Sequence, residues 1–445
     1  MSHTRTPVLL TTQSLIALSL LLKESTTNTF QTLSHSLLWE KSGFPHLVPE
    51  APGTDADAMT GYPMPTRSYN AGFTAKWDAT QAKAETTHLA FLLAYGMGLV
   101  TPTVPYAGVY LYDCQQQSGL TLPTASVGMR YSAEDGGPGA ALFGGFAVNG
   151  FSLDLLGKEY VGCSGNLIGT GRIARDIMEE LVTAHDNVTS LALASNGIKG
   201  STAGLRLTNL HALMSNYGCT DPAMYGSDCA VSAVSDAEPG VITLTSLGGA
   251  GVNTSYRATY RSKTKDDLGN ALTWTTFPAM SQLAWFTRGN VTLMVDGEWS
   301  GSAYVGGRSL GCDVTGLNLS WNNNAAPKFC PGGAGQGDYA DEIRVTGNKE
   351  LKLSMSRELT DMIFQFTSAK SRYTSLYYKV QQKDAIASSY YPYLEVIIPK
   401  LGMPDNPIAD SNGLLMETPG MIGFSHATYG GPIIRLQCAI PTVMA

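Results

Sequence analysis

The sequence predicts a mainly β protein, and three features of composition and patterning support this fold class. Of the 445 residues, 43% are hydrophobic and only 15% are charged, a balance that disfavours long solvated helices. The 48 Gly and 21 Tyr suit strands joined by tight turns. Short runs of alternating apolar and polar residues recur along the chain, and this alternation is the period of strands with one buried face.

Two of these alternating stretches line up with each other and predict an internal duplication. Residues 146–155 match residues 312–321, with Val, Gly, a large apolar residue and Leu in step. Each stretch is followed by a second strand that opens on Lys-Glu, at residues 158–159 and 349–350. We therefore expect two similar β-units in one chain.

Helical spacing of apolar residues appears in residues 88–99, 172–185 and 357–370, and the last two follow directly after the paired strands. We expect one helix beside each β-unit. The resulting division is an N-terminal arm with loops (1–84), a first unit (85–186), linking strands and loops (187–274) and a second unit (275–445) with a Gly-rich insertion at 322–347.

Charge and cysteine spacing argue against several function classes. The 36 acidic residues outnumber the 29 basic ones, and no run of Lys and Arg indicates a nucleic-acid binder. The 7 cysteines show no Cys-x-x-Cys spacing, so we expect no metal site and no cofactor. The apolar stretch at residues 8–22 is interrupted by polar residues and shorter than the roughly 20 residues of a spanning helix, so no membrane span is expected.

Two local motifs resemble catalytic or phosphate-binding signatures without their structural context. Residues 307–311 read Gly-Arg-Ser-Leu-Gly, but an alternating strand follows where a nucleophile elbow needs a helix. Residues 165–172 lack the Gly-Lys-Ser/Thr ending of a phosphate loop. We expect no catalytic residue and do not expect an enzyme.

The order of these motifs resembles that of tail tube proteins of long-tailed bacteriophages. Residues 122–130 give Leu-Pro-Thr and an aligned strand, and residues 143–171 give the Gly-containing strand pair that follows it in that family. Residues 299–307 and 342–359 are similar again. The resemblance implies two β-sandwich or split-barrel tube units, each with a flanking α-helix, whose inner strands join neighbours into a ring with a β-barrel lumen.

The same resemblance implies a structural virion protein that polymerises as stacked rings into the phage tail tube, the conduit for genome passage into the host. Because one chain carries two units, three chains would give a six-fold arrangement, and a trimer is favoured over a hexamer. The implied partners are the protein itself, other tail proteins such as the tape measure, terminator and baseplate or tip, and DNA in transient non-specific passage. The implied location is the virion tail, assembled in the host bacterial cytoplasm.

Candidate positions for these roles follow from the predicted strands and loops. The candidate lumen or inter-subunit strand positions are Asp154, Glu159, Asp313 and Glu350. The candidate inter-ring loop positions are Gly332, Gly335, Asp338 and Asp341. We expect an acidic lumen wall, because acidic side chains repel phosphates and avoid the affinity that counterion release gives to basic surfaces.

Other function classes remain open at this point. A secreted or surface β-sandwich adhesin or carbohydrate-binding protein is compatible with the Gly, Thr, Asn and Tyr content. A carbohydrate-active β-sandwich enzyme would need two carboxylates facing one cleft, and no spacing indicates such a pair. An outer-membrane barrel would need longer and more numerous alternating strands.

Overall fold

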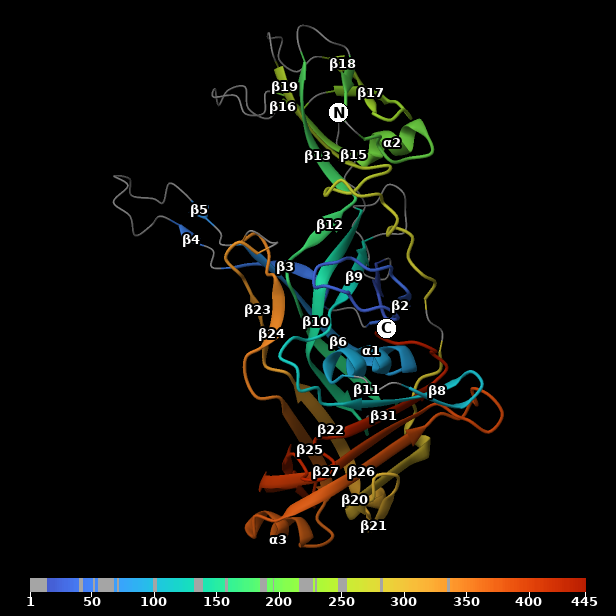
Figure 1. The fold of residues 1–445 in the computed structure, drawn as a ribbon, viewed down its shortest axis with the longest axis vertical. Coiled ribbons are helices and arrows are strands. Elements are labelled where there is room, and N and C mark those ends of the chain that lie inside the picture. The colour runs from blue at the N-terminus through green and yellow to red at the C-terminus, as the bar shows by residue number, and fades with distance from the viewer. Residues whose placement is uncertain are drawn as a thin grey trace. The chain divides into compact units, whose positions relative to one another are not determined.

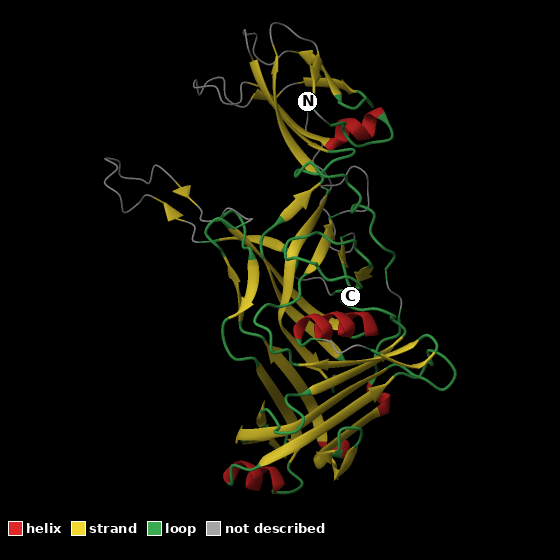
Figure 2. Ribbon diagram, in the orientation of Figure 1, coloured by secondary structure: helices red, strands yellow, loops and turns green. Residues whose placement is uncertain are grey.

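The structure is a computed structural model, and its described residues form a mainly β protein with 52% strand and 9% helix. The described residues are 14–39, 43–50, 53–54, 68–69, 72–98, 102–131, 139–156, 159–184, 190–194, 196–215, 227–228, 230–246, 254–280, 283–333 and 337–445. The chain forms two compact units (Figures 1 and 2). The small unit comprises Met1–Ala17, Gly128–Leu142 and Ile173–Pro278, and the large unit comprises Leu18–Val127, Phe143–Arg172 and Ala279–Ala445.

The small unit contains two antiparallel sheets with their own hydrophobic core. One sheet has the order β13 (Ile177–Ala184), β19 (Thr254–Arg261), β15 (Leu210–Ser215), β16 (Ser227–Asp228). The other has the order β14 (Ser190–Ala192), β18 (Val241–Ser246), β17 (Ala230–Val234). Helix α2 (Ala203–Asn209) begins after Thr202, whose hydroxyl caps it by accepting from the Leu205 amide. Ile242, Ala258 and Tyr260 are fully buried in the core, so this region is more than the linking strands and loops that we expected.

The helix expected at residues 172–185 is wrong. These residues form β12 (Ile173–Arg175) and β13 instead. Apolar residues spaced by four lie on one stripe of a helix, but an even spacing also places them on one face of a strand. The β13 residues that pack against the core are Met178 and Val182, whereas Leu181 is 61% exposed.

The large unit is organised around one antiparallel sheet of eight strands, called the eight-stranded sheet below (Figure 1). Every neighbouring pair in it is antiparallel. Its order is β3 (His46–Pro49), β6 (Phe73–Lys83), β11 (Gly162–Gly169), β10 (Ala140–Asp154), β22 (Val314–Asn322), β25 (Glu350–Glu358), β30 (Gly420–Gly423) and β27 (Tyr393–Asp405).

The eight-stranded sheet consists of two blocks of four strands with the same connectivity. In block A (β3, β6, β11, β10) and block B (β22, β25, β30, β27), the second strand leads into a helix and the third and fourth strands pair with each other. The fourth strand comes first in the chain, and it leads directly to the third in block A but through β28 and β29 in block B. These helices are α1 (Thr86–Gly96) and α3 (Ile363–Ala369). A small two-stranded hairpin separates the first two strands of each block, formed by β4 (Gly53–Thr54) with β5 (Ser68–Tyr69) and by β23 (Ala325–Lys328) with β24 (Glu342–Val345). The expected helix at 88–99 is confirmed as α1, and that at 357–370 is confirmed only for α3, because β25 continues to Glu358.

The sequence match used to predict the duplication does not mark equivalent strands. Its two stretches fall in β10 and β22, which are neighbours in the sheet, with Leu153 directly opposite Leu319. By connectivity, β10 corresponds to β27 and β22 corresponds to β3. The alternation that produced the match is shared by any strand with one buried face, so it could not identify the correct partner.

A second antiparallel sheet completes the large unit. Its order is β21 (Tyr304–Ser309), β20 (Val291–Trp299), β26 (Tyr373–Gln381), β27, β31 (Ile433–Cys438), β8 (Val109–Gln115), β7 (Thr103–Tyr106). Strand β27 belongs to both sheets. On one side it pairs with β26 from Tyr393 to Gly402, and on the other it pairs with β31 in its N-terminal part and with β30 from Leu401 onward. Helix α1 is buried along its whole length and packs against β11 and β31. The remaining strands are β1 (Leu15–Leu18), β2 (His35–Leu37), β9 (Ala125–Arg130), β28 (Ile408–Ser411) and β29 (Leu414–Glu417).

Candidate functional site: a polar sheet face and its edges

The eight-stranded sheet has one apolar, buried face and one polar face. On β25, Leu351, Leu353 and Met355 are buried and alternate with Glu350, Lys352 and Ser354, which reach the surface. The buried face packs against α1, where the indole Nε1 of Trp321 donates to the Gly96 carbonyl at 3.1 Å. The polar face carries Lys76, Asp78 and Thr80 of β6, Ser164 and Asn166 of β11, Ser152 and Asp154 of β10, and Asn318 and Ser320 of β22.

The polar face contains an open hollow of about 490 Å³. Five neighbouring strands line it, from β6 across the joint between the two blocks to β25. The polar residues around it are Asp78, Thr80, Asn149, Ser152, Ser164, Asn166, Ser320, Asn322, Glu350 and Lys352. The face is therefore concave as well as polar.

Hydrogen bonds between neighbouring strands tie the polar side chains of this face together. Asn166 Nδ2 donates to Asp78 Oδ1 at 2.6 Å, and Asn149 Nδ2 donates to Asn166 Oδ1 at 3.3 Å. The hydroxyls of Ser152 and Ser164 lie 3.1 Å apart across β10 and β11. These short side chains form hydrogen bonds with one another, so the surface between the strands consists of hydroxyl and amide groups.

The charges of the polar face largely cancel within it. Lys76 pairs with Asp78 at 3.1 Å, and Lys352 pairs with Glu350 at 2.8 Å. Burial raises the pKa of Asp154, although a hydrogen bond from the Leu156 amide works against that rise. The acidic wall that we expected is not a property of this face, and the net charge of −7 is not concentrated on it.

The structure brings two of the four candidate strand positions onto the polar face and separates the other two. Asp154 ends β10 and Glu350 begins β25, and both lie on this face. Glu159 is exposed before β11, where its carbonyl accepts from the Arg288 amide at 3.2 Å. Asp313 lies in a short 3-10 turn before β22 and accepts from the Thr360 hydroxyl at 3.0 Å.

The candidate inter-ring residues lie between β23 and β24, and Gly335 is outside the described residues. Gly332 is exposed in a turn with φ of +72°. The Asp338 carbonyl accepts from the Phe73 amide at 2.8 Å, and Asp341 Oδ2 accepts from the Cys330 amide at 2.7 Å. The described part of this insertion is therefore partly anchored to block A.

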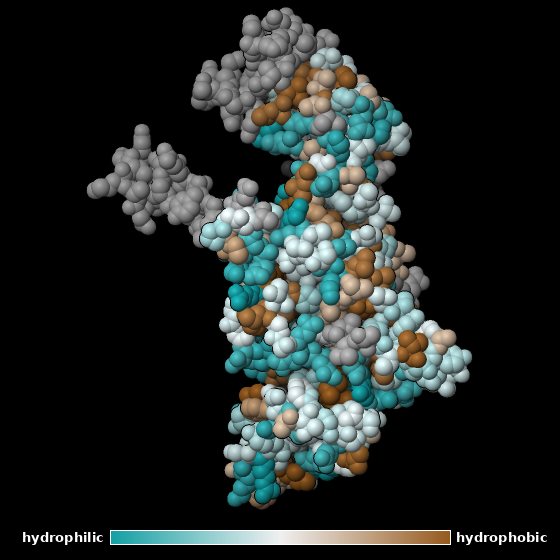
Figure 3. All heavy atoms as spheres, in the orientation of Figure 1, coloured by the Kyte–Doolittle hydropathy of each residue, from teal (hydrophilic) through white to brown (hydrophobic). Residues whose placement is uncertain are grey.

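The two blocks end differently at their last strands. Strand β10 of block A is paired with β22 along Gly150–Asp154, so close that a Cβ on Gly150 would meet the Trp321 carbonyl at 2.8 Å. In block B, β27 continues into β28, which pairs only with β29 among the described residues. All residues of β28 are exposed. On the face of the molecule drawn in Figure 3, hydrophobic patches are scattered over a largely hydrophilic surface. The β28 to β29 connection is a tight turn in which Asn412 and Gly413 both have positive φ.

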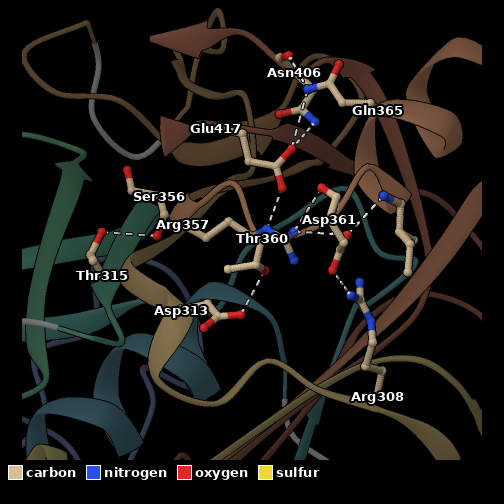
Figure 4. Close-up of polar contacts among 11 residues, drawn as sticks. Arg308, Asp313, Thr315, Ser356, Arg357, Thr360, Asp361, Gln365, Asn406 and Glu417 are labelled. Atoms are coloured by element: carbon tan, nitrogen blue, oxygen red, sulfur yellow. Dashed lines mark hydrogen bonds and ion pairs between the residues drawn. The ribbon is translucent and has the colours of Figure 1, made fainter. Parts of the chain in front are cut away.

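A buried ion pair fastens the β28–β29 hairpin to β25 (Figure 4). Arg357 of β25 and Glu417 of β29 are both fully buried and form a salt bridge. Asn406 Nδ2 donates to Glu417 Oε2 at 2.8 Å, and the Arg357 guanidinium also lies 4.7 Å from the Phe364 ring centre and 3.1 Å from Asp361. Such a pair is costly to desolvate and holds its partners in one geometry only when both are present.

Asp361 connects this ion pair to the surface. Although its partial burial works in the opposite direction, the Ile363 amide and the charges of Arg357 and Arg308 hold the pKa of Asp361 below its usual value. Sequence reasoning missed this cluster. Its signal was Arg357 itself, which occupies the next apolar position in the alternation after Leu351, Leu353 and Met355.

The described residues contain no group of three or more His, Cys, Asp or Glu side chains placed to hold a metal ion. None of the helices in the described part of the chain has the length and hydrophobicity to cross a membrane. Protein-family models give no match to the chain, and a search of curated proteins gives none.

Proposed function

We propose that this chain is the subunit of a tail tube, a structural protein that assembles into rings around a lumen and stacks them into a conduit for DNA. The observation that carries the proposal is the eight-stranded sheet, in which two blocks with the same strand order lie side by side with one concave polar face. The wall of a tube that is built by repeating one block sideways needs neighbouring blocks to pair in one sheet and to present the same face to the lumen.

The chemistry of the polar face supports a conduit for a polyanion. The described residues of this face are mostly Ser, Asn and Thr, and Lys76 and Lys352 are paired with carboxylates. Few positive charges are therefore left to neutralise phosphates and release their counterions, which is the main source of affinity for DNA. The hydroxyl and amide groups keep the surface hydrated. DNA could then move along the wall without being held.

The number of strands that each chain contributes is compatible with a ring of three chains. Three chains of eight strands each would contribute 3 × 8 = 24 strands to one wall. At roughly 4.8 Å between strands and a tilt of about 40°, the backbone circle would be roughly 45 to 50 Å across. Barrels of 22 strands already enclose a folded plug, so this wall leaves a wide lumen.

Electron microscopy of the purified protein tests the proposal. We expect rings or tubes with a central hole and three-fold symmetry, each ring showing six similar lobes. Class averages with no hole, or a protein that stays monomeric across concentration and salt, would contradict the tube function. Mass photometry on the same sample provides the number of chains per ring independently of the images.

A further inference from the structure

We propose that one chain joins the next by adding its free edge, the end of β27 together with β28, to strand β3 of a second copy. The assignment rests on the proposed ring function and names the two strands that close the ring. Its template is the joint inside the chain, where the last strand of block A (β10) pairs with the first strand of block B (β22). The corresponding strands at the two ends of the chain are β27 with β28, and β3.

A shared irregularity aligns the last strands of the two blocks residue by residue. The pairing of β10 with β11 shifts register just before Gly150, and the pairing of β27 with β30 shifts just before Asp405. Counting onward from these shifts, Leu153 corresponds to Ile408. The opposite strands agree with this count. Leu153 lies opposite Cys163, three residues before the Asn166 that faces Gly150, and Ile408 lies opposite Glu417, three residues before the Gly420 that faces Asp405.

The two equivalent residues differ sharply in exposure. Leu153 is 0% exposed because it lies against Leu319 of β22, whereas Ile408 is 43% exposed. A large apolar residue that is buried in one block and exposed in the other marks a surface that a partner strand covers. The partner that covers it in block A is the first strand of the next block.

Strand β3 offers the matching edge. It is the first strand of block A, and among the described residues it pairs on one side only, with β6. Pro45 precedes it and Pro49 ends it, and prolines at an edge limit indiscriminate pairing. Chain-to-chain pairing is thus confined to a short segment that a specific partner must fit.

The intrachain joint also predicts the register of the joint between chains. His46 lies opposite Lys76 as Ser320 lies opposite Lys352, and both lysines lie on the polar face in the strand that precedes the helix. Since Gly150 pairs with Asn322, its counterpart Asp405 should lie opposite Val48 of the next copy.

The free edge is ordered before any partner arrives. Asn406, within the proposed segment, is held by Glu417, and Glu417 is held by Arg357. A preorganised edge lowers the entropy lost on association.

Disulfide trapping tests the register. The variant Asp405→Cys/Val48→Cys places two thiols on one face of the proposed joint, and mild oxidation of assembled protein should give covalent products that end at three chains on a non-reducing gel. Each single variant is a control for the native cysteines. A mismatched pair, Asp405→Cys/Val104→Cys, uses an exposed residue of β7 and should give no such series.

The outcomes separate this joint from the tube function. Rings seen by microscopy that stay uncrosslinked, or that crosslink equally in the mismatched pair, would overturn the joint and leave the function standing. Absence of rings together with absence of crosslinks would remove both. A covalent series that continues to six chains would support the joint and overturn the ring of three.

Discussion

Block A and block B share their strand order, their hairpins and the position of their helix, yet they differ in what covers them. Helix α1 is buried throughout, whereas Phe366 of α3 is 64% exposed and the neighbouring Met362 is 51% exposed. Strand β10 is paired along its end, and β28 is exposed. The same strand order with unequal cover is the reason why we propose that a second copy completes block B.

The largest expected effect concerns the buried ion pair of block B between Arg357 and Glu417. Glu417→Gln removes the buried counter-charge of Arg357 and leaves only the partly exposed Asp361, and breaking a buried pair in this way costs about 3 to 5 kcal/mol of unfolding free energy. Urea unfolding measures the loss. The matched control is Glu350→Gln in the exposed Lys352 pair, which should cost no more than about 1 kcal/mol. Equal losses in the two variants would show that the buried cluster does not fasten block B.

The next effect separates assembly from stability. Ile408→Lys removes an apolar side chain worth about 1.5 to 3 kcal/mol when fully buried, so association between chains should weaken roughly tenfold to a hundredfold while the thermal midpoint of the monomer stays unchanged. Sedimentation velocity over a concentration series measures this. Leu268→Lys in the small unit, where Leu268 is 47% exposed, is the control and should assemble normally. If both variants assemble alike, the edge of block B is not a contact.

The smallest effect is the pH dependence that His88 contributes to block A. Burial lowers the pKa of His88 in α1 to about 4, and the hydrogen bond between Nε2 and the Leu38 carbonyl, at 2.8 Å, offsets this lowering only partially. Below pH 6.5 the imidazole of His88 is protonated in the unfolded chain but stays neutral in the folded chain. The free energy of unfolding therefore falls as the pH falls from 6.5 towards 4.

Between pH 7.5 and 5.5 the lowered pKa of His88 should reduce the free energy of unfolding by about 1.4 kcal/mol. The protection factors of the α1 amides, which compare the measured exchange rate with the intrinsic rate at the same pH, should therefore fall about tenfold at the lower pH, and His88→Gln should remove this fall. The α3 amides are the internal control, since α3 contains no histidine. An equal fall of the protection factors in both helices would place the pH sensitivity elsewhere.

Much of the fold class could be read from the sequence, because alternation reports which face of a strand is buried. Strand partners could not. The pairing of Met178 with Tyr260 that builds the small unit joins residues far apart in the chain, and nothing local encodes it. For the same reason Asp154 and Glu350 were found as polar strand positions, whereas the contact of Arg357 with Glu417 was missed: a charged residue at an apolar position is visible in the sequence, but its distant partner is not.

The pairing of β10 with β22 has a kinetic consequence for any ring of three chains. Half of the six joints in such a ring would already be made when a chain has folded, because covalent connection replaces a bimolecular encounter with an intramolecular one at an effective concentration of about millimolar. Two encounters between chains and one closure within the open trimer would then separate free chains from a closed ring, and partly built rings would be correspondingly short-lived.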